Sequence, residues 1–384
     1  MPGDLAGYLD EVRATIVDEI RRWVPTGGAY DEALYGPLLD YPLRPAKALR
    51  PALCLAVCRA LGGRLESALP TAAALELFHN AFLVHDDVED GSEQRRDGPT
   101  LHTTLGRSAA INVGDAMLAL TLRPLLENTR LVGLGPALRI LHEVSEMSVR
   151  TAEGQATELT WIREHPTGLS EQDYLNLVYR KTTVYSFVVP MRVGAIAARV
   201  PPEARVLDEL EAVAIPLGAA FQIQDDLLNL EGAADAVGKE PLGDLWEGKR
   251  TLMLLHALRH ASPAEAARAR EILRKPRPEP GTASQLAVAL RAAADALDAA
   301  GQAEAASVAR ASLRAHLDEK RAEDVAWLHA LLLRTGAMEA GHRAASAQAR
   351  RAADAFHALA PRLRAGVHAQ FLEGVVDFVV QRGR

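Results

Sequence analysis

The first group of residues that could do chemistry is a run of acids within residues 85–96, at the end of a long apolar stretch. Asp86 and Asp90 are spaced i,i+4, so on a helix their carboxylates lie one turn apart on one face. Like charges at this spacing destabilise a helix, and the negative end of the helix dipole adds to the cost. Taken alone, such a run is most often a solvated helix end. The same geometry also suits hard cations with oxygen ligands, such as Mg²⁺.

A second acid pair, Asp225-Asp226, strengthens the metal interpretation. Asp225 follows Asp86 by 139 residues and lies near the end of another apolar helical pattern, and basic residues follow both acid runs. Mg²⁺ is usually held by a few carboxylates together with substrate phosphates, rather than by an all-protein cage. Two facing carboxylate clusters with nearby Lys and Arg therefore predict a diphosphate site that contains several cations.

Long helices must position these clusters, and the sequence pattern supplies them. Apolar residues recur at three- and four-residue spacing in nearly every segment, and no stretch alternates β-branched with polar residues. Chain breakers bound the predicted helices at about 4–24, 46–62, 66–90, 101–127, 133–160, 170–198, 204–232 and 250–260. Long helices with short connections predict an all-α bundle.

Composition limits the class of protein. The chain has 384 residues, 48% of them hydrophobic and 24% charged, which fits a folded protein of two or three domains or one large one. Two cysteines exclude a disulfide framework, and a net charge of −7 argues against a nucleic-acid partner. Because no leader pattern and no long uncharged apolar window is visible, we expect a cytoplasmic protein without a transmembrane segment.

The motifs resemble those of the trans-isoprenyl diphosphate synthases, or polyprenyl synthetases, from about Lys47 to Arg382. The first aspartate-rich motif, DDxxD followed by RR, is complete in Asp86, Asp87, Asp90, Arg95 and Arg96. The FQxxDD motif is present as Phe221-Gln222 and Asp225-Asp226. Shorter matches are Lys47 and Arg50 of a GGKRxRP element, His79, the pair Lys181-Thr182, and Lys239 and Lys249 of a GK…D…GK tail.

Two positions depart from the family pattern. Asn229 stands where the second motif commonly has a third Asp, and an Asn carbonyl is a neutral, weaker metal ligand. Ala48 replaces the first arginine of the GGKRxRP element, whose two glycines are also lost. We expect activity to survive the change at Asn229, because Asp225 is the ligand that the resemblance implies most strongly.

The resemblance implies an isoprenoid-synthase-type helical bundle around a central cavity, formed by residues 1–384 as one domain. It implies head-to-tail condensation of isopentenyl diphosphate with an allylic diphosphate, and a homodimer. The catalytic residues it implies are Asp86, Asp90, Lys181, Asp225 and Lys239. The metal ligands it implies are Asp86, Asp87, Asp90, Asp225 and Asp226. These would bind about three Mg²⁺ ions, with Mn²⁺ as the alternative.

The resemblance also assigns residues that bind the substrates. They are Lys47, Arg50, His79, Arg95, Arg96, Thr182, Gln222 and Lys249. Because charge stabilisation on diphosphates can carry such a reaction, no side-chain nucleophile is required.

Product length depends, in this family, on the residues four and five before the first Asp. Here they are Phe82 and Ala81. At i−4, Phe82 lies one turn above Asp86 and can close the floor of an apolar tunnel. One bulky residue beside a small one predicts a short product, C20 with C15 as the alternative. The competing interpretation of Phe82 is plain core packing.

One segment, 276–320, has no family counterpart that we recognise. A Pro-rich joint precedes two Ala-rich helical patterns, at about 283–299 and 303–318, which predict an inserted αα-hairpin. A surface decoration, a lid and an extra subunit contact are all compatible with the pattern.

Two other functions remain open at this point. A class I terpene cyclase would carry Ser or Thr and then an acid in its second motif, where this chain has Asn229 and Ala233. A non-catalytic subunit of a two-component synthase would carry a broken first motif, which is intact here. Both features favour a prenyl diphosphate synthase.

Overall fold

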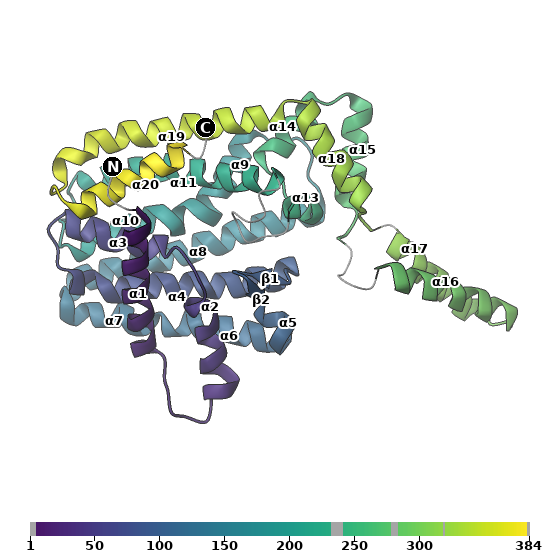
Figure 1. Cartoon of the computed structure of the whole chain (residues 1–384), viewed down its shortest axis with the longest axis horizontal. Coiled ribbons are helices and arrows are strands. Elements are labelled where there is room, and N and C mark those ends of the chain that lie inside the picture. Colours follow the sequence, from purple (N-terminus) through teal and green to yellow (C-terminus); the bar gives the residue numbers. More distant parts are fainter. Residues whose placement is uncertain (1–4, 232–240, 278–282, 318, 382–384) are drawn as a thin grey trace.

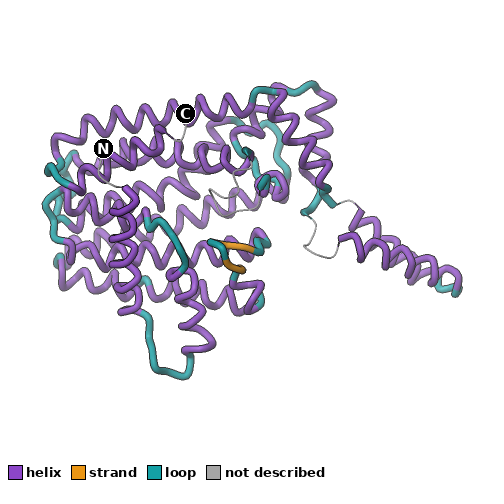
Figure 2. The backbone as a smooth tube through the Cα atoms, viewed as in Figure 1, coloured by secondary structure: helices purple, strands orange, loops and turns teal. Residues whose placement is uncertain are grey.

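The computed structural model describes residues 5–231, 241–277, 283–317 and 319–381. Nearly all of them are helical, which confirms the predicted all-α class (Figure 2). The elements of the first part are α1 Leu5–Trp23, the π-helical turn η1 Asp31–Tyr35, α2 Gly36–Leu43, α3 Leu49–Ala60, α4 Leu65–Asp90, β1 Gln94–Arg95, β2 Gly98–Pro99, α5 Leu101–Leu105, α6 Arg107–Leu120, α7 Leu122–Leu131 and α8 Leu134–Glu164.

The second part continues the bundle. Its elements are α9 Glu171–Val178, the π-helix η2 Tyr179–Val188, α10 Val189–Ala197, α11 Val206–Leu230, α13 Gly243–Glu247, α14 Leu252–His260, α15 Pro263–Arg274, α16 Ala283–Ala299, α17 Ala303–Leu317, α18 Ala322–Arg334, α19 Ala337–Leu359, the 3₁₀ turn η3 Ala360–Arg362 and α20 Val367–Gln381.

Long helices lie side by side and bury two apolar clusters. In Figure 1, α4, α8, α11 and α19 run roughly parallel to the long axis of the body, and α11 packs along α19. The larger cluster joins α3, α4 and η2 through residues such as Leu53, Leu77 and Phe187. The smaller one packs the end of α11 against α14 and α18 through Ile223, Leu254 and Leu328. These clusters fix the ends of α4 and α11, which carry the two acid pairs.

The only strands among the described residues form a small hairpin directly after α4. Gly91 ends α4 in the left-handed region (φ 64°), and β1 then pairs antiparallel with β2. Arg96 and Asp97 at the turn both have positive φ, a turn conformation that matches the twist of paired strands. Two-residue strands are too short to show the alternating pattern that predicts strands, so the all-α prediction is unaffected. The hairpin folds Arg95 back toward the end of α4.

Two predicted helices are divided in the structure. The segment 101–127 breaks at Gly106 (φ 85°) and near Thr121, giving α5, α6 and α7. The segment 170–198 changes to π-helix over Tyr179–Val188, which contains Lys181-Thr182. Apolar spacing cannot separate these cases, because each piece keeps a helical period.

The predicted αα-hairpin is present as α16 and α17, which project from the body (Figure 1). The two helices pack on each other through Ala294, Ala306 and Leu313. At the root, the Lys320 amide donates to the Pro276 carbonyl at 2.8 Å. That one domain spans residues 1–384 remains a prediction.

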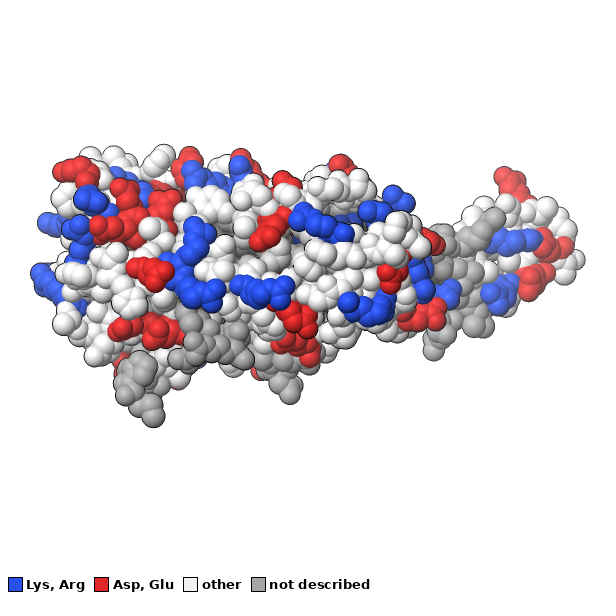
Figure 3. Space-filling view, turned by 90° about the horizontal axis from the view of Figure 1, so that it is seen from above, with Lys and Arg blue, Asp and Glu red and all other residues white. Residues whose placement is uncertain are grey.

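Surface charge and apolar content bear on the expected partners. On the face in Figure 3, acidic and basic side chains are interspersed without a large field of one sign.

Among the described residues, Arg107–Leu131 is long and apolar enough to cross a membrane by length and composition alone. In the fold this segment is two helices, α6 and α7, and 44% of its apolar window is buried within the protein. Core helices pass the same test, so the segment is weak evidence for a membrane span.

Candidate functional site

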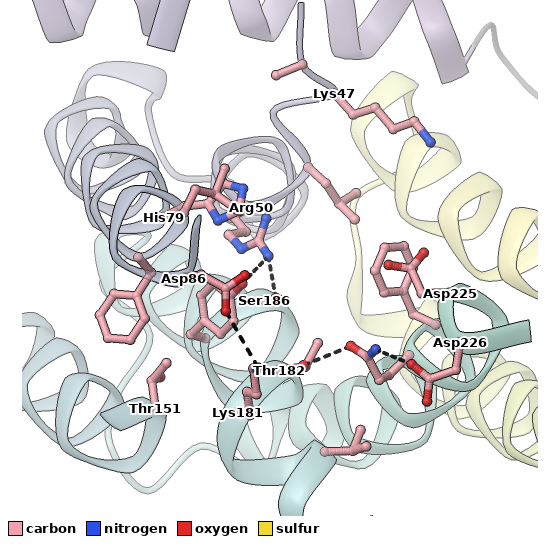
Figure 4. A pocket seen from close by; sticks show the side chains of 18 of the residues that line it. Lys47, Arg50, His79, Asp86, Thr151, Lys181, Thr182, Ser186, Asp225 and Asp226 are labelled. Atoms are coloured by element: carbon pink, nitrogen blue, oxygen red, sulfur yellow. Dashed lines mark hydrogen bonds and ion pairs between the residues drawn. The ribbon is translucent and has the colours of Figure 1, made fainter. Parts of the chain in front are cut away.

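A cavity of about 860 Å³ opens between the ends of α4 and α11, with η2 along one side (Figure 4). Most of the predicted site residues line it. They are Lys47, Arg50, His79, Phe82, Asp86, Arg95, Arg96, Lys181, Thr182, Gln222, Asp225, Asp226 and Lys249. Lys239 lies outside the described residues.

The first acid cluster stands at the last turns of α4 with cations around it. The Asp86 carboxylate lies 3.7 Å from Lys181 Nζ and 3.7 Å from Arg95 Nη2. Asp90 does not line the cavity, but its carboxylate lies 3.7 Å from Lys249 Nζ, which does. Burial raises the pKa of Asp90 to about 7, against the lowering effect of Lys249. The predicted one-turn spacing of the two acids is thus realised beside a cavity.

Asp87, predicted among the metal ligands, has a different role in the structure. Its side chain is 1% exposed, and both oxygens are engaged. Tyr41 donates to Oδ2 at 2.6 Å, and Arg95 donates to Oδ1 through Nε at 2.9 Å and through Nη2. Asp87 therefore positions Arg95, and its oxygens do not face the cavity.

The second acid cluster comes from the last turns of α11. Figure 4 shows Asp225 and Asp226 on the opposite side of the cavity from Asp86. Asp226 accepts hydrogen bonds from Tyr174 Oη at 2.7 Å and Gln222 Nε2 at 2.8 Å. Burial, followed by repulsion from Asp244, raises the pKa of Asp226 to about 8. Asp86 and the pair Asp225-Asp226, distant in sequence, therefore line one cavity.

Asn229 acts on the backbone of the next element. Its Oδ1 accepts a hydrogen bond from the Asp244 amide at 3.1 Å, near the start of α13. This bond satisfies one of the amides that a helix N-terminus leaves unpaired. Asn229, which stands where the family commonly has a third Asp, thus supplies an acceptor that holds Asp244 at the cavity.

Lys181 has an acidic partner that the sequence analysis missed. Its ammonium group forms an ion pair with Glu158 of α8, which also lines the cavity. Burial alone would lower the pKa of Lys181, but Glu158 and Asp86 raise it above its usual value. Lys249 likewise contacts Glu247 at 2.8 Å and Asp244 at 3.6 Å. Both lysines are held charged beside the acid clusters.

The donor set suits divalent cations that are shared with a substrate. The acids facing the cavity offer only oxygen ligands, the type that Mg²⁺ and Ca²⁺ prefer. The described residues contain no preformed group of three or more His, Cys, Asp or Glu side chains able to hold a metal ion. Cations here would need further oxygens, such as those of a diphosphate, to complete their coordination.

A separate basic pocket in the same cavity contains no acid pair. Arg50 donates to Tyr185 Oη and to Ser186 Oγ, both at 2.8 Å, and its guanidinium stacks on the Tyr185 ring. His79 lies 3.5 Å from Arg96, and its Nδ1 is buried without a hydrogen-bond partner. Burial, with Arg50 and Arg96 nearby, lowers the pKa of His79 well below its usual value. Such a pocket fits an anion that binds without metal.

An aromatic wall lies between the basic pocket and the acid clusters. Phe82 lines the cavity and stacks on Phe78 at 4.6 Å and on Tyr185 at 6.5 Å between ring centroids. Ala81 is fully buried and does not line the cavity. Of the predicted pair Ala81 and Phe82, only Phe82 lines the cavity, because adjacent positions on a helix face different directions.

The supporting residues were missed for a common reason. Glu158, Tyr41, Tyr174 and Tyr185 belong to no motif that the sequence analysis used, and each acts through a partner distant in sequence. Tyr185 could have been suggested by its place four residues after Lys181, but its contact with Arg50 depends on the packing of η2 against α3.

The chain is similar in sequence to known proteins over most of its length. The polyprenyl synthetase family model matches residues 32–290. A short chain isoprenyl diphosphate synthase from Methanocaldococcus jannaschii is 32% identical over 265 residues, covering 69% of this chain and 75% of that protein. The octaprenyl diphosphate synthase of Escherichia coli is 32% identical over 220 residues, covering 57% and 64%.

Solved structures agree with the fold. A polyprenyl synthase from Caulobacter crescentus, crystallised with calcium and isoprenyl diphosphate, superposes with a TM-score of 0.73 at 26% identity. The alignment covers 100% of this chain and 99% of that one. The relatives include both short and long products, so they leave the chain length open.

Proposed function

Because this chain belongs to the polyprenyl synthetase family, we propose that it joins isopentenyl diphosphate head to tail to an allylic diphosphate, with Mg²⁺ as cofactor. The single observation that carries this proposal is the placement of Asp86 and Asp225 across one cavity from each other, with Lys181 and Lys249 beside them.

The allylic diphosphate would lie between the two acid pairs. Asp86, Asp90 and Asp225 would hold about three Mg²⁺ ions, with Mn²⁺ as the alternative, and these ions supply Lewis-acid neutralisation of the diphosphate. Lys181, Lys249 and Arg95 stabilise the charge that grows on the leaving diphosphate as the allylic C–O bond breaks. Lys239, which lies outside the described residues, stays a predicted member of this group. Acids and lysines thus act on the same leaving group.

Isopentenyl diphosphate would occupy the basic pocket. Arg50, His79, Arg96 and Lys47 bind its diphosphate without metal, and Tyr185 and Ser186 orient Arg50. Its double bond then forms the new C–C bond with the allylic carbon, and the proton lost afterwards goes to the departing diphosphate. Thr182 and Gln222, hydrogen-bonded to each other at 2.9 Å, line the path between the two substrates.

The product length we propose is C20, with C15 as the alternative. The support is Phe82, which lines the cavity and is held by Phe78 behind it. A growing chain that meets this ring pair stops early, because moving two stacked rings in a packed core costs free energy.

We also propose that the chain forms a homodimer in the cytoplasm. Four exposed leucines lie in two i,i+4 pairs, Leu122 and Leu126 on α7, and Leu134 and Leu138 on α8. Leu126 is 61% and Leu134 65% exposed, and large exposed apolar patches commonly mark an interface. The occupant we assign to it is a second copy of this chain.

A product assay tests the proposed function. Purified protein is incubated with Mg²⁺, isopentenyl diphosphate and, separately, the C5, C10 and C15 allylic diphosphates, and the products are identified by mass spectrometry. Elongated trans-prenyl diphosphates ending at C20 are expected. A cyclic hydrocarbon formed without isopentenyl diphosphate would instead indicate a terpene cyclase. No consumption of any pair would favour a non-catalytic subunit.

A further inference from the structure

A second cavity lies apart from the acid clusters, between the α8–α9 connection, the loop after α13, and helices α14 and α15. It encloses about 240 Å³. The basic side chains that line it are His165, Arg250, Arg259, Arg270 and Arg274. Among the described residues that line it, none is Asp or Glu. The cavity therefore collects positive charge without a matching acid.

Arg250 is the buried member of this group. Its side chain is 6% exposed, and its guanidinium donates to the Gly248 carbonyl and lies 3.1 Å from His165 Nδ1. Burial lowers the pKa of Arg250 to about 10, and no carboxylate in the described structure offsets that effect. A buried cation without a counter-charge is costly. An anion bound beside Arg250 would therefore stabilise its charge.

Lys320 adds a second buried cation behind Arg250. It is 2% exposed and donates to the carbonyls of Leu245 at 3.0 Å and Trp246 at 2.6 Å. A Cβ placed at Gly248 would meet Lys320 Nζ at 3.4 Å and Arg250 Nη1 at 3.6 Å, so both cations approach the same residue. Burial, followed by repulsion from Arg250, lowers the pKa of Lys320 to about 8, although Glu247 acts in the opposite direction.

The exposed arginines have a partial local explanation. Arg259 and Arg274 lie in the last turns of α14 and α15, where the helix dipole favours cations. The preference of helix C-termini for cations does not explain Arg250, nor why a cavity forms beside it.

The floor of the basic cavity is apolar, with Leu255 and Leu273 buried. At about 240 Å³ the space falls below the range of roughly 300–1,000 Å³ typical of sites for larger organic ligands, so a small ion fits it better.

We propose that this basic cavity binds a small phosphate-type anion, and that inorganic diphosphate is its best-matched ligand. Guanidinium groups donate pairs of parallel hydrogen bonds to phosphate oxygens, and four of them border the cavity. Arg250 directly follows Lys249 and also borders the main cavity. The inference rests on this cavity alone and is independent of the proposed reaction.

The test is a calorimetric titration of inorganic diphosphate into full-length protein in EDTA. A Lys47→Ala/Arg50→Ala background removes two of the four basic residues of the metal-free pocket in the main cavity. In that background we compare Arg259→Ser/Arg270→Ser/Arg274→Ser with a matched control, Arg343→Ser/Arg350→Ser/Arg351→Ser, which removes three exposed arginines from α19. All substituted arginines of both triples are exposed, so both proteins are expected to fold, which circular dichroism and melting temperatures check.

Saturable binding is expected in the background protein. The cavity triple should weaken it at least about tenfold and the control less than about twofold, since only the cavity arginines can donate charge-assisted hydrogen bonds to the anion. Inorganic phosphate, titrated in parallel, should bind more weakly than diphosphate. Absence of saturable binding, or equal weakening by both triples, would overturn the site. Equal affinity for the two anions would overturn diphosphate as its matched ligand.

Discussion

At the scale of single residues, the site depends on cations and carboxylates that hold one another charged. Lys181 lies between Asp86 and Glu158, and Lys249 lies between Asp90 and Glu247. Unfolded lysines would be solvated, whereas these are buried and have raised pKa values despite burial. Their charge is therefore available inside a partly desolvated cavity, where electrostatic stabilisation of a leaving group is strongest.

We expect the Phe82 side chain to limit the length of the product. Replacing Phe82 with Ala removes the ring that borders the cavity and leaves Phe78 as the next obstacle. Mass spectrometry of the products should then show chains one or more C5 units longer than those of the natural protein. Phe82→Leu should give a smaller extension, and Phe78→Ala alone should change little. Unchanged length in Phe82→Ala would assign Phe82 to core packing.

Motif residues could be predicted at this scale, and their partners could not. The sequence placed Asp86 and Asp225 in one site because both stand near helix ends after apolar runs. The engagement of Asp87 depends on Tyr41, which is 46 residues away, and on Arg95, which a two-residue strand folds back. Contacts of that kind arise from tertiary packing, which local spacing does not encode.

At the scale of elements, the π-helix η2 positions Lys181, and α8 packs closely against it. A Cβ at Gly154 would lie 2.5 Å from the Lys181 amide nitrogen, a distance that real side chains do not adopt. π-helical stretches within helices occur frequently at functional sites. The glycine therefore allows α8 to place Glu158 beside Lys181.

Gly154→Ala tests this close approach. The added methyl group must push η2 away from α8, and displacement of a positioned group by about 1 Å can cost about 10²-fold in rate. We expect kcat to fall at least about tenfold on that basis. The matched control is Gly135→Ala on the same helix, where nothing lies within 4 Å. If both variants keep full activity, the contact does not position Lys181.

The projecting hairpin of α16 and α17 can be tested for a role in activity. Its root is closed within the body by the Lys320–Pro276 hydrogen bond and by the ion pair between Lys275 and Asp324 at 2.9 Å. Replacing residues 283–317 with a flexible linker keeps that root. We expect kcat to stay within about twofold, since linkers of this kind are tolerated where few contacts are lost. A large loss of activity would show that α16 and α17 act as a lid or a subunit contact.

The helices of the hairpin were among the best-predicted elements, for a physical reason. Two Ala-rich amphipathic stretches flank Gly301, and in the described structure the two helices pack mainly on each other. In contrast, α5, α6 and α7 were merged into one helix, and the divisions at Gly106 and Thr121 depend on packing against α4. Local pattern thus predicts isolated elements better than core elements.

At the scale of the whole molecule, the bundle brings two distant acid pairs together and leaves an apolar row on its outside. The row of leucines on α7 and α8 lies outside both buried clusters of the bundle. A second copy that covers it would remove this surface from water, at about 25 cal/mol per Å² of apolar area. The surface that we propose for the dimer is therefore apolar, whereas the cavity is charged.

Light scattering on a sizing column tests the assembly. The natural protein should elute as a dimer, and Leu126→Arg/Leu138→Arg should shift it toward monomer, because buried unpaired charges oppose association. Leu333→Arg, at an exposed leucine on α18, is the control and should leave the dimer intact. A monomeric natural protein would contradict the proposed homodimer.

The most direct measurement of the central claim is the rate at which labelled isopentenyl diphosphate enters product in three aspartate variants. Asp86→Asn and Asp225→Asn each remove one acid from opposite sides of the cavity, and Asp115→Asn removes an exposed acid that lies 3.5 Å from His85. We expect Asp86→Asn and Asp225→Asn each to lower kcat by about 10²-fold or more. Asp115→Asn should keep kcat within about twofold of the natural protein. Near-normal turnover in Asp86→Asn or Asp225→Asn would contradict the central claim.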